Sequence, residues 1–284
     1  MSYKKALIRL LDRPGGRFLL GKFATGFLRR IGGDGVEILY VHGMWTRRVG
    51  NNFFPDGLRF DYVYPDFQVW RQQAETYASE TRDYWLQHYK PQQGDTIVDV
   101  GAGRGEDTLT FSRRAGSTGR VIAIEPHPLS FAILTNFCRL NRFTNVTALQ
   151  LALMDKPSEA LMTESPSGWF ENAVGNVSGK GITVQAATLD EICKAHRVKH
   201  IAFLKMNIEG AERHALLGME SMLAGVQQIC VACHDFRADL GHGEQFRTRM
   251  FVQQFLVKHG FTLSGRPDDP RNYVRDHVFG LRRG

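Results

Sequence analysis

The sequence predicts an α/β protein in which helices cover both faces of a mostly parallel sheet. Short β-rich runs alternate with longer helical runs from Thr96 onward, and the first β-rich run ends in a glycine-rich turn. Too few residues separate the last two β-rich runs for a helical crossover, so these two runs must pair antiparallel. We therefore expect a Rossmann-like sheet of seven strands with an antiparallel last strand, preceded by a mostly helical N-terminal extension.

The composition is that of a globular protein with a basic surface. The chain has 284 residues, 43% of them hydrophobic and 23% charged, so it can bury a sizeable core. Its formal charge is 36 − 29 = +7, which favours anionic partners without indicating nucleic acid in particular. Four cysteines do not make a disulfide framework in a chain this long. No run approaches the roughly 20 apolar residues of a membrane span, and Arg9 interrupts the first apolar run. We therefore expect a cytoplasmic protein.

Residues 1–90 are expected to form an extension in front of the main domain at 91–284. The first thirty residues pair apolar and basic positions and predict two short amphipathic helices, broken at Pro14-Gly15-Gly16. Such helices can rest on an acidic membrane surface, but packing on the body or on a second subunit is the expected arrangement. A further helix is predicted from about Asp66 to Tyr89, in an aromatic-rich stretch that forms either a lid over the substrate or the core of the extension. The extension is thus a candidate substrate cap or oligomer arm.

The main domain is expected to alternate strands and helices. The predicted strands are Thr96–Val100, Val121–Ile124, Val146–Leu149, Ile201–Met206, Ile229–Ala232, Phe261–Ser264 and His277–Leu281. The predicted helices are Glu106–Ala115, Pro128–Asn141, Leu189–His196, Ala211–Leu223 and Gln245–His259. Residues 155–185 break this rhythm and contain four glycines, which predicts a hairpin or a lid.

The glycine-rich turn predicts an adenine-cofactor site. Strand residues Val98-Asp99-Val100 run into Gly101-Ala102-Gly103-Arg104-Gly105 and then into a helix, and glycines let such a turn approach a ligand closely. Glu125 follows twenty positions after Gly105, at the end of the next predicted strand. A carboxylate there can accept hydrogen bonds from both ribose hydroxyls of the cofactor.

Three details favour a sulfonium cofactor over a dinucleotide. Asp99 lies at the strand end, where a carboxylate suits a cationic methionyl group better than a pyrophosphate. The turn reads Gly-Ala-Gly-Arg-Gly and lacks the dinucleotide spacing of glycines. The reversed last strand, predicted between Val274 and Leu281, departs from the all-parallel dinucleotide fold. S-adenosylmethionine is therefore the expected cofactor.

The runs DVGAGRGEDT, AIEPHP, LKMNIEGAE and HVFGLRR resemble those of the FkbM family of S-adenosylmethionine-dependent methyltransferases. The resemblance covers about residues 75–284. It implies a class I methyltransferase fold and O-methylation of a hydroxyl on a sugar or a polyketide-type small molecule. The cofactor-binding positions that it implies are Asp99, Gly101, Ala102, Gly103, Glu125, Pro126, Ala152, Leu153 and Asn207. The family usually has Asp at position 207. Because Asn is neither an anionic base nor a strong metal ligand, we expect no metal.

A hydroxyl acceptor also needs a group that removes its proton. The candidates follow the fourth and fifth long strands, where ligands bind in open α/β sheets: Glu209, His234 and Asp235. Histidine has the most suitable intrinsic pKa, so our hypothesis is that His234 is the base and that Asp235 or Glu209 orients it. The alternative is that His234 and Asp235 only cap the next loop.

Other classes of protein are less consistent with the residues. An amino-methylating nucleic-acid enzyme would carry prolines after Asn207, and none follows there. A nicotinamide-dependent oxidoreductase is opposed by the position of Asp99 and by the reversed last strand. A non-catalytic binding module is opposed by the intact glycine turn together with Glu125, whereas Asn207 leaves this alternative open. Cys230 and Cys233 could suggest zinc or redox chemistry, but they lie within a predicted strand without a second pair, so buried structural thiols are expected.

Overall fold

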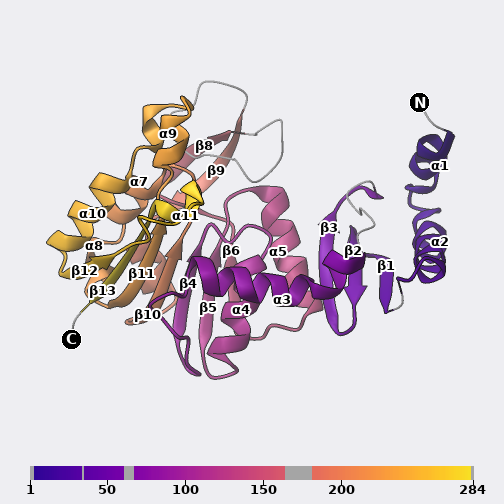
Figure 1. The fold of residues 1–284 in the computed structure, drawn as a ribbon, viewed down its shortest axis with the longest axis horizontal. Coiled ribbons are helices and arrows are strands. Elements are labelled where there is room, and N and C mark those ends of the chain that lie inside the picture. Colours follow the sequence, from indigo (N-terminus) through magenta and orange to yellow (C-terminus); the bar gives the residue numbers. More distant parts are fainter. Residues whose placement is uncertain (1–2, 34, 61–66, 164–180, 283–284) are drawn as a thin grey trace. The chain divides into compact units, whose positions relative to one another are not determined.

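A computed structural model of the chain describes residues 3–33, 35–60, 67–163 and 181–282 (Figure 1). The chain forms two compact units. The N-terminal unit comprises Met1–Ser79 together with Ala132–Phe143, and the sheet unit comprises Glu80–Phe131 together with Thr144–Gly284.

The sheet unit contains the predicted seven-stranded sheet, in the order β12-β13-β11-β10-β4-β5-β6 (Figure 1). Its strands are β4 (Thr96–Val100), β5 (Arg120–Ile124), β6 (Val146–Leu149), β10 (Ile201–Met206), β11 (Val226–Ala232), β12 (Phe261–Ser264) and β13 (His277–Arg282). Strand pairs from β6 through β11 are parallel, whereas β13 is antiparallel to both β11 and β12. The predicted fold class, including the reversed last strand, is confirmed.

Among the described helices that follow the glycine-rich turn, three of the five predicted ones begin at the expected residue, two need correction, and two short ones were not predicted. Those that lie within the sheet unit are α4 (Glu106–Ala115), α6 (Leu189–Ala195), α7 (Glu212–Leu217), α8 (Glu220–Leu223), α9 (Asp235–Asp239), α10 (Arg249–Lys258) and α11 (Asn272–Arg275), with a 3₁₀ turn at Glu244–Phe246. Helix α5 (Pro128–Leu140) begins in the sheet unit and continues into the N-terminal unit from Ala132. The helix predicted over 211–223 is divided at Gly218, where an added Cβ would lie 2.0 Å from the Met154 carbonyl oxygen. The helix predicted from Gln245 starts only at Arg249, after the 3₁₀ turn.

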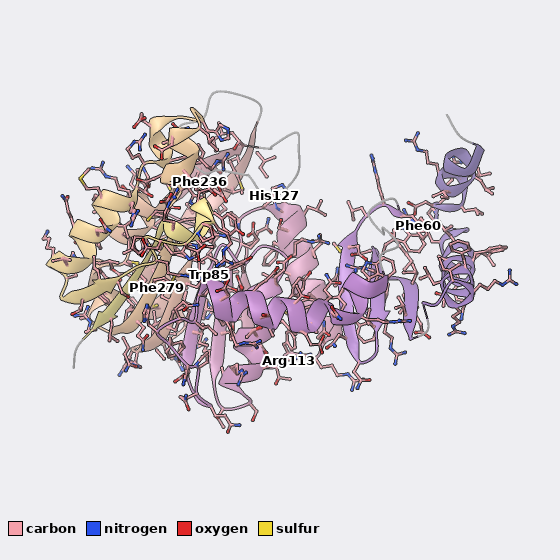
Figure 2. All side chains as sticks on the ribbon, viewed as in Figure 1. Phe60, Trp85, Arg113, His127, Phe236 and Phe279 are labelled. Atoms are coloured by element: carbon pink, nitrogen blue, oxygen red, sulfur yellow. The ribbon has the colours of Figure 1, made fainter. Side chains whose placement is uncertain are left out.

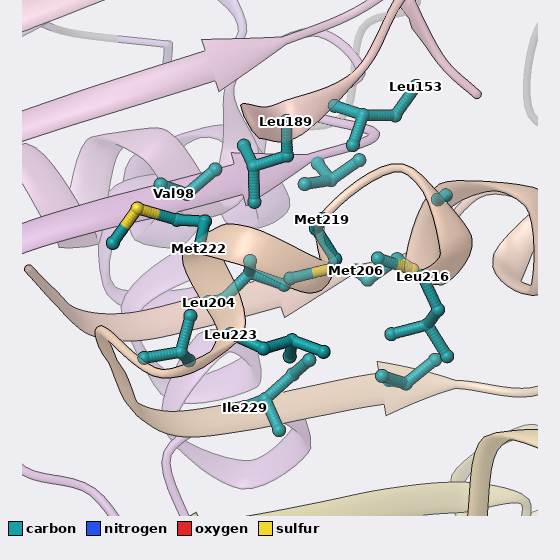
Figure 3. Packing of buried hydrophobic residues seen from close by; sticks show 14 of the residues in the cluster. Val98, Leu153, Leu189, Leu204, Met206, Leu216, Met219, Met222, Leu223 and Ile229 are labelled. Carbon is teal, nitrogen blue, oxygen red and sulfur yellow. The ribbon is translucent and has the colours of Figure 1, made fainter. Parts of the chain in front are cut away.

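Apolar side chains fill both faces of the sheet, because parallel strands are buried on both sides. On one face, Val98 and Leu204 pack with Met206, Leu216 and Met219 (Figure 3). On the other face, the alternate residues Ile97 and Phe203 pack with Trp85, Phe111 and Phe279, and Figure 2 labels Trp85 and Phe279 of this cluster. Two charged residues, Asp99 and Lys205, continue the second face and lie directly opposite each other on β4 and β10.

A second, smaller sheet of the sheet unit has the order β7-β9-β8. Its strands are β7 (Ala152–Leu153), β8 (Ser158–Thr163) and β9 (Gly181–Ala187). Strands β8 and β9 pair antiparallel, which confirms the hairpin predicted for residues 155–185. The lid expected there falls on 164–180, outside the described residues.

The N-terminal unit contains the two predicted short helices, α1 (Tyr3–Leu11) and α2 (Arg17–Arg30), with the break at residues 14–16. Helix α3 (Phe67–Tyr84) begins in this unit and ends five residues earlier than expected, at the start of the sheet unit. No described helix is long and apolar enough to cross a membrane.

Three strands of the N-terminal unit were not predicted: β1 (Val36–Val41), β2 (Met44–Val49) and β3 (Asn52–Gly57), which form an antiparallel sheet. The turn between β1 and β2 is His42-Gly43, and both residues have positive φ (50° and 80°), as the right-handed twist of a two-residue hairpin requires. In this sheet, the Arg47 guanidinium forms a buried ion pair with Asp56 at 2.6 Å.

Candidate active site

A cavity opens at the carboxyl ends of β4, β5 and β10, within the sheet unit. This is the edge at which ligands bind in open α/β sheets. The turns after these three strands and strand β7 form most of the cavity wall. The described lining residues are Val100, Gly101, Ala102, Gly103, Glu106, Asp107, Ile124, Glu125, Pro126, Leu151, Ala152, Leu153, Met162, Lys205, Asn207, Ile208, Glu209 and Ala211.

The glycine turn joins the three strand ends tightly. Gly101 has φ +73°, and a Cβ there would lie only 1.9 Å from the carbonyl oxygen of Asn207. The Gly101 and Ala102 amides donate to the Ile124 carbonyl at 2.9 and 3.0 Å, and the Asn207 amide donates to the Val100 carbonyl at 3.0 Å. Only glycine permits both the backbone conformation and the close approach of the β10 turn.

Glu125 lies at the end of β5 with 7% of its surface exposed. Its carboxylate accepts hydrogen bonds from the amides of Gly103 and His127, both at 2.9 Å. Burial raises the pKa of Glu125 to about 7, although the two amides oppose this shift. The carboxylate therefore lies at the cavity wall, where a ligand with hydroxyl donors can complete its hydrogen bonds.

Asp99, expected to contact the cofactor, does not line the cavity. It is fully buried and accepts hydrogen bonds from Lys205 Nζ at 2.9 Å and from Thr108 Oγ1 at 2.7 Å. Lys205 Nζ also donates to the Gly101 carbonyl at 2.7 Å and lies 3.5 Å from Asp107 Oδ2. The carboxylate of this cluster that faces the cavity is Asp107, whose pKa burial raises to about 6 even though Lys205 lowers it.

Sequence reasoning assigned no role to Lys205 or Asp107. The available signal was a lone lysine in the otherwise apolar strand Ile201–Met206, since a buried charge needs a partner. Asp107 lies in the first turn of α4, where its charge also interacts favourably with the helix dipole.

A second charged cluster lies after β10 and β11. His234, 5% exposed, contacts Glu209 Oε1 through Nε2 at 3.2 Å and Glu212 Oε1 through Nδ1 at 3.0 Å. Arg237 donates to the other oxygen of Glu209 at 2.5 Å. Burial lowers the pKa of His234, but the two carboxylates outweigh burial and raise it to about 10. The imidazole is thus a cation that joins two glutamates.

Glu209 is the member of this cluster that faces the cavity. Its φ is +53°, an unusual backbone conformation for a residue other than glycine, and such strain concentrates at functional sites. Burial raises the pKa of Glu209, yet the contacts with His234 and Arg237 prevail and lower it. Glu209 is therefore held as a carboxylate at the cavity.

Asp235 lies away from the cavity lining and caps a helix. Its carboxylate accepts hydrogen bonds from the amides of Thr248 and Arg249, at 3.0 Å each, at the start of α10. This is the loop-capping arrangement that the sequence left open as the alternative.

The structure thus brings nine of the twelve proposed site residues to one cavity and separates three. Asp99 and His234 lie behind the lining, each bonded to a group that faces the cavity, and Asp235 serves as a cap. The nine that line the cavity are Gly101, Ala102, Gly103, Glu125, Pro126, Ala152, Leu153, Asn207 and Glu209.

Neither a metal site nor a disulfide is found among the residues that the structure describes. In that part of the chain, no group of three or more His, Cys, Asp and Glu side chains is arranged to hold a metal ion. All four cysteines are free and buried, and burial raises the pKa of Cys230 and Cys233. This agrees with the expectation of structural thiols.

A parallel sheet with a reversed β13, a glycine turn after β4 and an acidic residue after β5 define the Rossmann-like class of methyltransferases. Residues 99–263 match the family described as "Methyltransferase FkbM domain". The chain belongs to this family, as the resemblance of its motifs implies.

A curated relative and two solved structures are similar to parts of the chain. The hexuronic acid methyltransferase AglP of Haloferax volcanii is 28% identical over 144 residues, which cover 50% of this chain and 57% of that protein. The chain therefore spans little more than half of that relative. The FkbM methyltransferase of Methylobacillus flagellatus is 15% identical, with a TM-score of 0.47 over 75% of this chain and 60% of that one. A putative methyltransferase of Streptococcus mutans, solved in complex with SAH, is 11% identical, with a TM-score of 0.45 over 72% of this chain and 97% of that one.

Proposed function

We propose that the protein transfers the methyl group of S-adenosylmethionine to a hydroxyl of a small molecule such as a sugar. The observation that carries this proposal is that one cavity is lined by the glycine turn and by the carboxylates of Glu106, Asp107, Glu125 and Glu209. Among its described lining residues, Lys205 is the one basic side chain. An acidic lining suits a cationic cofactor and disfavours the anionic pyrophosphate of a nicotinamide cofactor.

The lining residues fit the parts of S-adenosylmethionine. Glu125 can accept hydrogen bonds from the two ribose hydroxyls, and the apolar side chains of Pro126, Ala152 and Leu153 can pack on the adenine. Asp107, rather than the buried Asp99, is the carboxylate that can bind the methionyl ammonium. When bound, S-adenosylmethionine supplies an activated methyl group.

Glu209 is proposed as the residue that orients the acceptor hydroxyl and takes its proton as the new O–CH₃ bond forms. His234 is less suited to be the base, because its pKa of about 10 keeps it protonated and its two ring nitrogens already contact Glu209 and Glu212. Its proposed role is instead to position Glu209, together with Arg237.

A sugar acceptor is supported by the family resemblance and by the relative named for its action on hexuronic acid. An RNA acceptor is disfavoured because the carboxylates that line the cavity would repel a phosphate backbone.

The test is turnover of methyl-labelled S-adenosylmethionine with a panel of neutral sugars and uronic acids, with bulk RNA as a rival acceptor. We expect label in a methyl ether of a sugar, and a fall in kcat of about 100-fold or more in Glu209→Gln with unchanged binding of S-adenosylhomocysteine. Glu159→Gln, on the exposed edge of β8 and outside the cavity lining, is the matched control and should turn over like the wild type. Unchanged turnover in Glu209→Gln, or label in RNA alone, would contradict the proposal.

A further inference from the structure

Helices α1 and α2 of the N-terminal unit expose large apolar side chains. Phe18, Phe23 and Phe27 of α2 are exposed to 71%, 80% and 55% of their surface. Leu7, Leu10, Leu19 and Ile31 on or beside the two helices are each about half exposed. A run of this kind exceeds the single exposed apolar residues that are normal on soluble proteins, and it indicates an interaction surface.

The exposed face of α2 is not the face that packs on its own unit. Leu20 and Leu28 are buried in one cluster with Ile38 and Trp45. Gly21 lies so close to β1 that an added Cβ would be 2.9 Å from the Ile38 carbonyl oxygen. The fold of the N-terminal unit therefore accounts for one side of α2 and leaves the phenylalanine side without a described partner.

The exposed side of α2 is also basic. Lys22, Arg29 and Arg30 are exposed beside the phenylalanines, and the Lys22 ammonium lies 5.5 Å from the centre of the Phe18 ring. Residues 1–33 contain eight Lys and Arg and one Asp, a net charge of +7. The remaining residues have 36 − 8 = 28 basic and 29 − 1 = 28 acidic side chains, a net charge of zero. The entire net charge of the protein is thus concentrated in α1, α2 and their connections.

The exposed phenylalanines and the net charge of +7 together favour one kind of binding partner over the others. A second copy would bring a charge of +7 against +7, which opposes a symmetric contact through this face. RNA would neutralise the charge but leave the phenylalanines exposed to water. An anionic lipid surface satisfies both, because aromatic and aliphatic side chains enter the boundary between headgroups and acyl chains while Lys and Arg contact the headgroups.

We propose that α1 and α2 hold the protein on the surface of an anionic membrane, with Phe18, Phe23 and Phe27 inserted and the basic side chains on the headgroups. The interaction is peripheral and reversible, and it requires both the apolar and the electrostatic contribution.

The test is sedimentation of the full chain with vesicles of phosphatidylcholine alone or mixed with phosphatidylglycerol. We expect binding to the anionic vesicles that is at least about tenfold tighter than to the neutral ones and that weakens in high salt. Phe18→Ser/Phe23→Ser/Phe27→Ser should lose about tenfold or more of this binding. Lys22→Gln/Arg29→Gln/Arg30→Gln should lose the preference for anionic lipid.

The matched control changes three exposed apolar side chains of the sheet unit, as Leu240→Ser/Met250→Ser/Val257→Thr. These residues are 64%, 66% and 59% exposed, so the control removes similar apolar surface elsewhere. It should bind vesicles like the wild type. Circular dichroism and the unfolding midpoint establish that each variant is folded. The proposal is overturned if the wild type does not bind the vesicles or if the control loses as much binding as the phenylalanine variant. It is also overturned if the three phenylalanines are instead required for dimerisation without vesicles or for binding of RNA.

Discussion

Lys205 lines the cavity and connects several of the groups around it. Its ammonium is almost completely buried, and it reaches Asp99, Asp107 and the Gly101 carbonyl, so it links β10 to both ends of the glycine turn. Burial lowers the pKa of Lys205, but Asp99 and Asp107 outweigh burial and raise it, so the lysine remains charged. Removing one member of such a buried group leaves the others uncompensated, which costs more than the pair itself contributes.

The first prediction concerns this ion pair. Lys205→Met should lower the free energy of unfolding by about 3–5 kcal/mol, because Asp99 is left as an unpaired buried carboxylate. Asp99→Asn in the Lys205→Met background should restore part of the loss, since the orphaned charge is then removed. Urea unfolding of the two single variants and the double variant gives the coupling energy. Strictly additive losses would contradict a functional ion pair at this position.

The second prediction concerns Glu125. Since burial raises the pKa of this carboxyl to about 7 and ribose hydroxyls bind best to the ionised form, affinity for S-adenosylhomocysteine should fall as the pH drops below about 7. Glu125→Gln should weaken binding by about 1.5–3 kcal/mol at pH 8 and remove this pH step. Calorimetric titrations at pH 6, 7 and 8 measure both effects. Glu159→Gln, on the exposed edge of β8, is the control and should bind like the wild type.

At the residue scale the sequence predicted which positions gather at the site better than what each one does. Glu125 and the glycines could be placed because a strand end followed by a turn fixes the backbone. The partners of Asp99 and His234 could not be predicted, because they depend on the register of β4 against β10 and on the turns after β10 and β11. Because of these long-range contacts, Asp99 pairs with Lys205 rather than lining the cavity, and His234 is held in its protonated form by Glu209 and Glu212.

At the scale of elements, the glycine turn lets the end of β4 pack closely against the turn that follows β10. The third prediction is that Gly101→Ala abolishes measurable binding of S-adenosylhomocysteine and destabilises the protein by more than the conformational cost alone. Its φ is +73°, and the new Cβ would lie 1.9 Å from the Asn207 carbonyl oxygen.

Gly94→Ala is the matched control for this substitution. Gly94 has φ +93°, but its nearest neighbour would be 3.9 Å from an added Cβ. It should therefore cost only about 1–2 kcal/mol, the penalty of a left-handed conformation, and leave binding intact. Comparable losses in the two variants would show that close packing of the turn is unimportant.

Elements were predicted well where an apolar run is both continuous and buried on two faces. Strands β4 and β10 have the expected bounds for this reason. The edge strands β6 and β12 are only partly buried, but they also have the expected bounds. Strands β1 to β3 were missed because their sequences mix apolar residues with Arg47, Arg48 and Asp56, and β3 contains Pro55. Tertiary pairing of Arg47 with Asp56 compensates those charges, which local sequence does not reveal.

At the scale of the whole molecule, the titration of His234 links the site to global stability. Its pKa is raised in the folded state, from 6.5 to about 10. Its contribution to stability is therefore fully present below pH 6.5 and is lost as the pH rises toward 10. The raised pKa values of the buried Cys230 and Cys233 thiols also lower the stability of the folded protein at high pH. The pH dependence of the wild type therefore has to be compared with that of a His234 variant.

The fourth prediction follows from this linkage. The free energy of unfolding should decrease between pH 6.5 and 10 more steeply in the wild type than in His234→Gln. His234→Gln itself should lose about 3–5 kcal/mol at pH 6.5, because Glu209 and Glu212 lose their shared cation, and less at pH 10. Urea unfolding at four pH values measures the difference. Parallel pH profiles for the two proteins would contradict the assignment of His234 as a cation.

The central claim is that the cavity beside the glycine turn binds S-adenosylmethionine. The most direct measurement is a calorimetric titration of the purified protein with S-adenosylhomocysteine, with NAD and NADP titrated in parallel. We predict binding of S-adenosylhomocysteine in the micromolar range at pH 8, weakened by about 1.5–3 kcal/mol in Glu125→Gln at that pH, and no heat from either nicotinamide. Binding of a nicotinamide, or S-adenosylhomocysteine binding that does not depend on Glu125, would contradict the account.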